Sequence, residues 1–326
     1  MAVRRHRWPV VLVIVGLWLL LTPPVGSAES RDLGPELMIS GPVAARAIAC
    51  RGGLVHEDRP VVLLIPGTGL TGTESFADGF GPLLAAAGFD WCTVEFPDLG
   101  LGDVYGNVEF VVSAVRTLTE RTGHQVSLVG RSQGAIHARA AVRWWPDLRD
   151  RVDAVVTVAG ANQGLALASA RCGVAPCYPV TWQLNPDSRF MLALNNRPIP
   201  AGPTYAAIGS VDDLVINPGR VPGETAPYFI RGLGRANVLV QDLCPGRSVG
   251  HMATLFDPIV AAIVLDVPSH RAVFGADAGA GRCATAGGPD VTRAAATLAA
   301  SMVRQSDPFD PRLVSIEPSS PEYVRD

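Results

Sequence analysis

A serine lies between two glycines in residues 130–134 (GRSQG), and its surroundings constrain the fold more than any other part of the sequence. Residues 125–129 before it are a short, mostly apolar run of strand type, and residues 135–144 after it have helical spacing. A tight strand-to-helix turn needs small neighbours and exposes the serine hydroxyl at the carboxyl edge of a sheet. The five residues alone are a weak signal, because a chain rich in Gly and Ser produces them by chance. Their position between a strand and a helix predicts that Ser132 is a nucleophile.

Strands and helices alternate along the chain, which predicts a doubly wound parallel sheet. The run at 61–65 is wholly apolar, as is typical of a strand covered on both faces. A chain of 326 residues with 48% hydrophobic and 17% charged residues suits one large α/β domain. Residues 29–60 are expected to be an irregular leader, and the tail after about 306 is expected to be irregular. The predicted strands are 61–65, 90–96, 125–129, 152–158, 204–208 and 237–240; the predicted helices are 74–87, 107–121 and 135–144, with others starting near Asp187 and His251.

The basic residues exclude several kinds of chemistry, because all 27 of them are Arg and none is Lys. A Schiff base, a phosphate-binding P-loop lysine and a Ser-Lys dyad all require lysine. The net charge of -3 gives no electrostatic reason to expect a nucleic-acid partner.

The amino terminus has the three parts of a secretory signal. Arg4, Arg5 and Arg7 form a positive head, residues 8–21 are apolar, and small residues precede a cleavage position after Ala28. An uncleaved membrane anchor is the alternative, but the apolar run falls short of the ~20 residues that a spanning helix needs. We therefore expect a signal peptide at 1–28, one catalytic domain at 29–326, and a secreted protein.

Six cysteines lie in the part of the chain that follows the signal. An even number in a secreted chain indicates disulfides, and six cysteines allow fifteen pairings that the sequence does not separate. No CxxC pair or neighbouring histidine supports a zinc site, so no metal is expected. The cysteines are Cys50, Cys92, Cys172, Cys177, Cys244 and Cys283.

Residues 67–72 (GTGLTG) match the pattern GxGxxG after one predicted strand and before a helix. In a dinucleotide-binding turn, Glu95 would bind the ribose. Pro66 interrupts that junction, however, and nicotinamide cofactors are scarce outside the cell. The favoured interpretation is an oxyanion hole, in which the first loop and the residue after the nucleophile each supply one backbone N–H, here from Thr68 and Gln133. No cofactor is expected. A second glycine cluster, at 100–106, is interpreted as a flexible loop.

A serine nucleophile needs a base, and that base needs an acid to orient it. In the expected chain order the acid and then the histidine follow the nucleophile, on loops after later strands. His251 and His270 satisfy this order, and His270 is interpreted as a solvated surface residue. His251 follows the strand at 237–240 and begins an apolar helical stretch, so it is the predicted base.

The acid is expected in the turn 209–215, directly after the strand at 204–208. Asp212 or Asp213 would emerge there at the same sheet edge as Ser132. Asp187 and Asp242 are alternatives, and Asp187 is interpreted as the cap of a helix.

Together these segments resemble the secreted lipases of the Candida antarctica lipase B family and their actinobacterial relatives. Their joint order, from about Cys50 to Cys283, is more specific than any one motif. A further segment, 183–190 (QLNPDSRF), is common in bacterial lipases. The resembling segments are 64–69 (LIPGTG) with 71–72 and 75–76, then 132–134 (SQG), 212–215 (DDLV) with Pro218, Cys244 and His251.

The resemblance implies an α/β-hydrolase fold, with a mostly parallel central sheet and helices on both faces. It implies Asp212 as the acid, because the family's aspartate is followed by an acidic residue and two aliphatic ones. It also implies the disulfides Cys50 with Cys92 and Cys244 with Cys283, which leaves Cys172 with Cys177. One departure is Arg131, which stands where the family has a tryptophan directly before the nucleophile.

The expected function is therefore a secreted serine esterase or lipase that hydrolyses carboxylic esters or acylglycerols through Ser132, Asp212 and His251. Its partner is an ester or lipid substrate, with a lipid–water interface as a further partner, and the protein is expected to be a monomer. An acyltransferase or polyester hydrolase with the same triad is the first alternative. A secreted binding protein with a degenerate hydrolase fold and a nicotinamide enzyme are the others. The segment 165–196 is a candidate border of the pocket.

Overall fold

A seven-stranded sheet forms the centre of the protein, in the order β1-β3-β2-β4-β5-β6-β7. The computed structural model describes residues 32–56, 58–270 and 276–324. β1 runs antiparallel to β3, and the other neighbouring strands are parallel. The strands are β1 (Ile48–Arg51), β2 (Val61–Ile65), β3 (Trp91–Val94), β4 (Val126–Arg131), β5 (Val152–Val158), β6 (Thr204–Gly209) and β7 (Asn237–Leu239).

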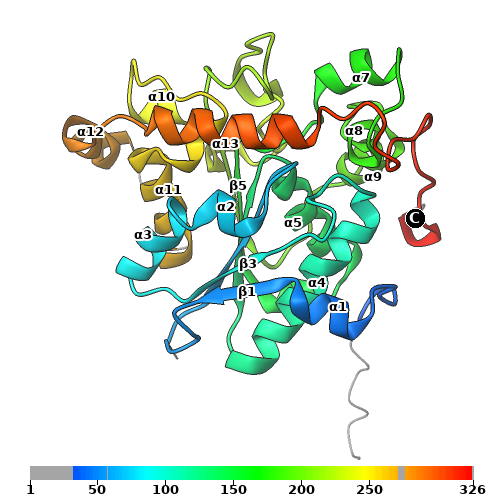
Figure 1. Cartoon of the computed structure of the whole chain (residues 1–326). Helices are drawn as coiled ribbons and strands as arrows, with labels where there is room; N and C mark the ends of the chain where they lie inside the picture. Colours follow the sequence, from blue (N-terminus) through cyan, green and yellow to red (C-terminus); the bar gives the residue numbers. More distant parts are fainter. Residues whose placement is uncertain (1–31, 57, 271–275, 325–326) are drawn as a thin grey trace, which may run out of the picture. The chain divides into compact units, whose positions relative to one another are not determined.

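Helices cover both faces of the sheet, and an apolar core lies on each face. Figure 1 shows α4 and α5 on one face and α3 and α11 on the other. The α-helices are α1 (Gly41–Arg46), α2 (Gly72–Phe76), α3 (Phe80–Ala86), α4 (Val104–Thr122), α5 (Gln133–Trp144), α6 (Leu148–Arg151), α7 (Ala166–Cys172), α8 (Pro179–Gln183), α9 (Arg189–Asn195), α10 (Val240–Leu243), α11 (Pro258–His270), α12 (Ala276–Thr285) and α13 (Val291–Arg304). The 3-10 helices are η1 (Gly223–Thr225), η2 (Gly234–Ala236), η3 (Met252–Leu255) and η4 (Glu322–Val324).

The predicted mostly parallel sheet is confirmed, and β2 and β5 have the predicted bounds. Every residue of these two strands is buried, because helices cover both of their faces. The expected irregular leader is wrong in part, since α1 and β1 form within it. The predicted helix at 74–87 is also wrong, because it breaks into α2 and α3. A side chain at Gly79, between them, would collide with the carbonyl oxygen of Leu255.

Three disulfides join the six cysteines, in the pairing that the resemblance implied. Cys50 and Cys92 are register partners on the antiparallel strands β1 and β3. The Cys172–Cys177 bridge closes a short loop after α7, and Cys244–Cys283 joins the end of α10 to α12. These covalent links are typical of an oxidising compartment.

The predicted signal peptide at 1–28 lies outside the described residues. Within the described residues, no helix is both long enough and apolar enough to cross a membrane. Residues from Asp32 onward form one compact unit.

Candidate active site

Ser132 lies between β4 and α5 in a backbone conformation that few residues with a side chain adopt. Its φ is 54° and its ψ is -120°. The turn is tight, because a side chain at Gly130 would collide with the backbone of Gly134, and one at Gly134 would collide with the carbonyl oxygen of Ile65. Both flanking glycines are therefore sterically required. The predicted strand, turn and helix around Ser132 are confirmed.

The imidazole of His251 joins the serine to a buried carboxylate. Its Nε2 lies 3.1 Å from Oγ of Ser132, and its Nδ1 lies 2.8 Å from Oδ2 of Asp213. The Asp213 side chain is fully buried, and that of His251 is 8% exposed. Serine, histidine and aspartate thus form one continuous hydrogen-bonded chain, the geometry of a nucleophile, its base and an orienting acid. The structure brings Ser132 and His251 together, as the sequence predicts.

The two neighbouring aspartates have different environments. The expectation that Asp212 is the acid is wrong, because the carboxylate that bonds to His251 is that of Asp213. The carboxylate of Asp212 is 27% exposed and lies 3.7 Å from the Arg220 guanidinium. The carboxylate of Asp213 is instead fully buried, and its N–H donates to the carbonyl of Ser210, directly after β6. Its Oδ1 accepts the backbone N–H groups of Val215 and Ile216 at 3.1 and 3.0 Å, which leaves Oδ2 for His251. The similarity of residues 212–215 to the family's pattern therefore did not show which of the two aspartates contacts His251.

The remaining candidate acids lie elsewhere. Asp242 is exposed on α10, and Asp187 precedes α9 without capping it. The cap of α9 is Ser188, whose hydroxyl accepts the N–H of Met191 at 3.0 Å. His270 is exposed and pairs with Asp266 at 2.9 Å on its own helix, as expected of a surface histidine.

The charges of the site favour an ionised acid and a neutral base. Burial lowers the pKa of His251, and the Arg131 guanidinium lowers it further, against the opposing effect of Asp213. Burial raises the pKa of Asp213, but His251, the N–H of Ile216 and Arg131 outweigh it, so the net shift is downward. A neutral imidazole accepts a proton at its Nε2 while the carboxylate holds its Nδ1–H.

The loop after β2 and the start of α5 meet beside Ser132. A side chain at Gly67 would lie 3.0 Å from Cβ of Ser132, so this loop passes close to the nucleophile. The hydroxyl of Thr68 donates to Oε1 of Gln133 at 2.5 Å and links the two predicted oxyanion residues. In the described part of the chain, neither the backbone N–H of Thr68 nor that of Gln133 has an acceptor. Two N–H donors are thus available near the nucleophile.

The second glycine cluster, predicted as a flexible loop, forms hydrogen bonds with Gln133 and with the turn that contains Thr68. The carbonyl of Gly100 accepts Nε2 of Gln133 at 2.9 Å, and the carbonyl of Leu99 accepts the N–H of Gly69 at 2.8 Å. The carboxylate of Asp98 holds this loop through the N–H groups of Gly100 and Gly102. The loop around residue 100 therefore also contacts the GxGxxG turn, through the hydrogen bond from Gly69 to Leu99.

Glu95, the ribose ligand of the dinucleotide alternative, is engaged within the protein. It accepts the N–H groups of Gly72 and Thr73, both at 2.8 Å, at the start of α2. The glycine-rich turn therefore leads into a helix whose first turn this carboxylate caps.

A cavity of about 290 Å³ opens beside the triad, and its walls are largely apolar. Leu165 and Leu184 line it, which places two residues of the expected border segment at the cavity. Leu298 and Met302 line it from α13. The cavity suits a substrate whose body is apolar and whose reacting group lies next to Ser132.

α13 is the part of the site that the sequence analysis missed. Ser301 donates its hydroxyl to the carbonyl of Thr68 at 2.9 Å, and Arg304 donates to the carbonyl of Gly69 at 2.9 Å. Arg304 also forms a two-pronged pair with Glu74, with both contacts at 2.7 Å. The pair lowers the pKa of Glu74 to about 2. Apolar residues at helical spacing in 291–304 and a preceding Asp290 were the available signal.

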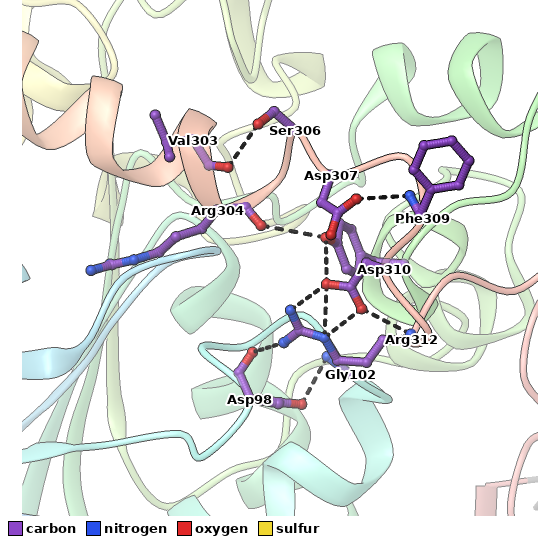
Figure 2. A network of polar contacts seen from close by, with 10 residues as sticks. Asp98, Gly102, Val303, Arg304, Ser306, Asp307, Phe309, Asp310 and Arg312 are labelled. Atoms are coloured by element: carbon purple, nitrogen blue, oxygen red, sulfur yellow. Dashed lines mark hydrogen bonds and ion pairs between the residues drawn. The ribbon is translucent and has the colours of Figure 1, made fainter.

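The segment that follows α13 is irregular, as expected, but polar contacts anchor it. Figure 2 shows Arg312 between the carboxylate of Asp310 and the backbone of Asp98, to whose carbonyl it donates at 3.1 Å. The carboxylate of Asp98 in turn accepts the N–H of Gly102. The carboxyl-terminal segment is thereby tied to the loop that supports Gln133.

A mostly parallel sheet with helices on both faces and a serine at a strand-to-helix turn is the architecture of the α/β-hydrolase fold. The model of the class 2 lipase family matches residues 107–240 of this chain. That region contains β4, the turn at Ser132 and the turn with Asp213, but not His251.

Two lipases are similar to the chain over longer stretches. Lipase B of Pseudozyma (Candida) antarctica is 28% identical over 216 residues, which cover 64% of this chain and 61% of that lipase. The crystal structure of Aspergillus fumigatus lipase B superposes with a TM-score of 0.78 and 22% identity, over 92% of this chain and 76% of that one. The chain thus has the α/β-hydrolase fold and resembles lipase B, which confirms the resemblance found in its sequence.

Proposed function

We propose that the protein is a secreted serine esterase or lipase that hydrolyses carboxylic esters. The single observation that carries the proposal is the pair of hydrogen bonds from His251, one to Ser132 and one to Asp213. The similarity to class 2 lipases and to lipase B supports the same class of reaction. The disulfides are consistent with secretion.

In the proposed reaction, Oγ of Ser132 attacks the ester carbonyl while Nε2 of His251 takes the hydroxyl proton. Asp213 holds the ring in the required tautomer and stabilises the imidazolium that forms. The backbone N–H groups of Thr68 and Gln133 bind the oxyanion of the tetrahedral intermediate. The imidazolium then protonates the departing alcohol, and an acyl group remains on Ser132.

Deacylation repeats these steps with water. His251 takes a proton from the water as it attacks the acyl carbonyl, and the collapse of the second intermediate returns that proton to Ser132. The carboxylic acid leaves, and the enzyme regains its initial protonation. The apolar lining from Leu165, Leu184, Leu298 and Met302 favours an acyl or alcohol group of hydrocarbon character.

Hydrolysis of p-nitrophenyl butyrate tests the proposal. We expect Ser132→Ala and His251→Gln each to lower kcat/KM at least about 10⁴-fold, because each removes a member of a cooperative unit. His270→Gln is the matched control, and it should retain the wild-type rate because His270 is exposed and pairs with Asp266 on its own helix. Normal turnover by Ser132→Ala would exclude the proposed mechanism.

A further inference from the structure

Arg131, directly before the nucleophile, has a buried guanidinium. The residue is 1% exposed and ends β4. Its Nη2 donates to the backbone carbonyl of His251 at 2.9 Å and contacts Sδ of Met252 at 2.8 Å. Its Nε is buried without a hydrogen-bond partner. The side chain of Arg131 is thus hydrogen-bonded to the backbone of His251, whose ring contacts Ser132.

A buried guanidinium is costly to keep, because it loses its hydration and keeps its charge. In the described residues, no carboxylate oxygen lies within ion-pair distance of Arg131. Two buried ionic groups of opposite charge therefore act on His251. Asp213 bonds to its ring, and Arg131 bonds to its main chain.

We propose that Arg131 is a positioning residue that holds the main chain of His251 and whose fixed charge keeps the imidazole in its proton-accepting form in mildly acidic solution. This inference rests on the proposed esterase function. It assigns a role to the residue that directly precedes the nucleophile.

The charges around His251 support this role. From β4 comes Arg131, and from the turn after β6 comes Asp213, which favours the charged ring. Asp257, after η3, is fully buried and bonded to Arg247 at 2.8 Å, so its charge is already paired. The residues of α13 that line the cavity are uncharged: Leu298, Ser301 and Met302. Arg131 is thus a cation that opposes protonation, and it adds to the effect of burial, which is the larger cause of the lowered pKa of His251.

The arrangement has a catalytic consequence. With a neutral imidazole, the charges of Asp213 and Arg131 balance each other inside the site. Protonation of the ring adds a second positive charge near Arg131, which is unfavourable until the oxyanion supplies a negative one. Arg131 therefore disfavours a protonated His251 in the free enzyme. It disfavours this charge less in the tetrahedral intermediate, where the negative oxyanion balances the imidazolium.

Four variants separate charge from packing. Arg131→Met and Arg131→Gln remove the charge, and glutamine retains an N–H donor for the His251 carbonyl. Arg131→Lys retains the charge, and Arg143→Met removes a guanidinium from the far end of α5 as a matched control. For each folded variant, kcat/KM for p-nitrophenyl butyrate is measured against pH, with circular dichroism as the check on folding.

We expect Arg131→Met and Arg131→Gln to shift the acidic limb of the profile of kcat/KM against pH to a higher pH, by about one unit. At a pH below this limb, that shift is about a tenfold loss of activity. Arg131→Lys and Arg143→Met should keep the wild-type limb. An unshifted limb in Arg131→Met and Arg131→Gln would overturn the proposal, and so would an equal shift in Arg131→Lys. A purely structural role would lower stability and leave the limb in place.

A measurement without turnover separates this inference from the function on which it rests. In a Ser132→Ala background with ¹³C-labelled imidazoles, the His251 resonance is assigned with His251→Gln and titrated both with Arg131 intact and with Arg131→Gln added. An upward shift of the His251 pKa in the glutamine variant supports the role of Arg131 even if Ser132→Ala proves active. The same pKa in both proteins overturns it.

Discussion

The active-site cavity has two walls that differ in how they are built. The inner wall consists of Ser132 and His251, with Asp213 buried behind the imidazole, and the three side chains are buried or nearly so. The outer wall, consisting of Leu298, Ser301, Met302 and Gln305, comes from α13 and the residue that follows it. Leu298 is 40% exposed and Met302 is 61% exposed.

The difference lies in what fixes each wall. The inner wall is fixed by close backbone packing at Gly130 and Gly134 and by hydrogen bonds within the triad. The outer wall is held by a few polar contacts, from Ser301 to Thr68 and from Arg304 to Gly69 and Glu74. We therefore expect substitutions in the inner wall to act on the chemical step by orders of magnitude, and substitutions in the outer wall to act weakly.

The largest effect should come from the two adjacent aspartates. Asp213→Asn should lower kcat about 10⁴-fold, because an amide no longer holds His251 in the base tautomer. Asp212→Asn should stay within about threefold of wild type, because the carboxylate of Asp212 is partly exposed and weakly paired. The measurement is kcat on p-nitrophenyl butyrate. The reverse order of effects would place the acid at Asp212 instead of Asp213.

The second effect concerns the packing of the elbow. Gly134→Ala should lower the free energy of unfolding by about 1–3 kcal/mol or more, because the new methyl group collides with the backbone of Ile65. Gly106→Ala on α4 is the matched control, since a side chain there meets open space. It should stabilise the protein by about 0.5–1 kcal/mol. Urea denaturation measures both, and equal stability of the two variants would refute the packing argument.

The third effect is the pH dependence of the wild-type enzyme. Because burial and Arg131 lower the pKa of His251, the base stays neutral to below its ordinary value of about 6.5. Activity should hold at pH 6.5 and fall about tenfold per pH unit only below the lowered pKa. A pH profile of kcat/KM tests this. Half-maximal activity above pH 7 would contradict the charge balance that we describe.

The smallest effect should come from the outer wall. Arg304→Met removes contacts with Gly69 and Glu74, and an ion pair exposed to this degree is worth about 0.2–1 kcal/mol. We expect amide exchange to quicken in 291–304 and kcat/KM to change less than about fivefold. Arg59→Met, at an exposed pair with Asp58, is the control and should change neither quantity. A loss as large as that of Asp213→Asn would mean that the two walls do not differ.

The sequence was informative where local rules determine the structure. The strand, the two glycines and the helix around Ser132 identify the elbow, because a tight turn admits few residue types. The apolar runs identified β2 and β5, because strands covered on both faces have few polar residues. His251 followed from chain order.

The remaining features depend on contacts between distant parts of the chain. Asp212 and Asp213 are the same type of residue at adjacent positions. The turn after Ser210 determines which of the two carboxylates points toward His251, and the residue type does not encode that direction. β1 is four residues long and gains its place through pairing with β3 and through the Cys50–Cys92 bridge. The site role of α13 rests on contacts with Thr68 and Gly69, more than 200 residues away.

Labelling the nucleophile with a fluorophosphonate tests the central claim most directly, because an activated serine attacks the phosphorus, fluoride leaves, and a stable phosphonyl-serine remains. The protein is treated with a fluorophosphonate, and peptide mass spectrometry locates the adduct in wild type, in Ser132→Ala and in Asp212→Asn. Our account predicts one adduct on Ser132 in wild type and in Asp212→Asn, and none in Ser132→Ala. An adduct on another residue, or equal labelling of Ser132→Ala, would contradict the assignment of the nucleophile.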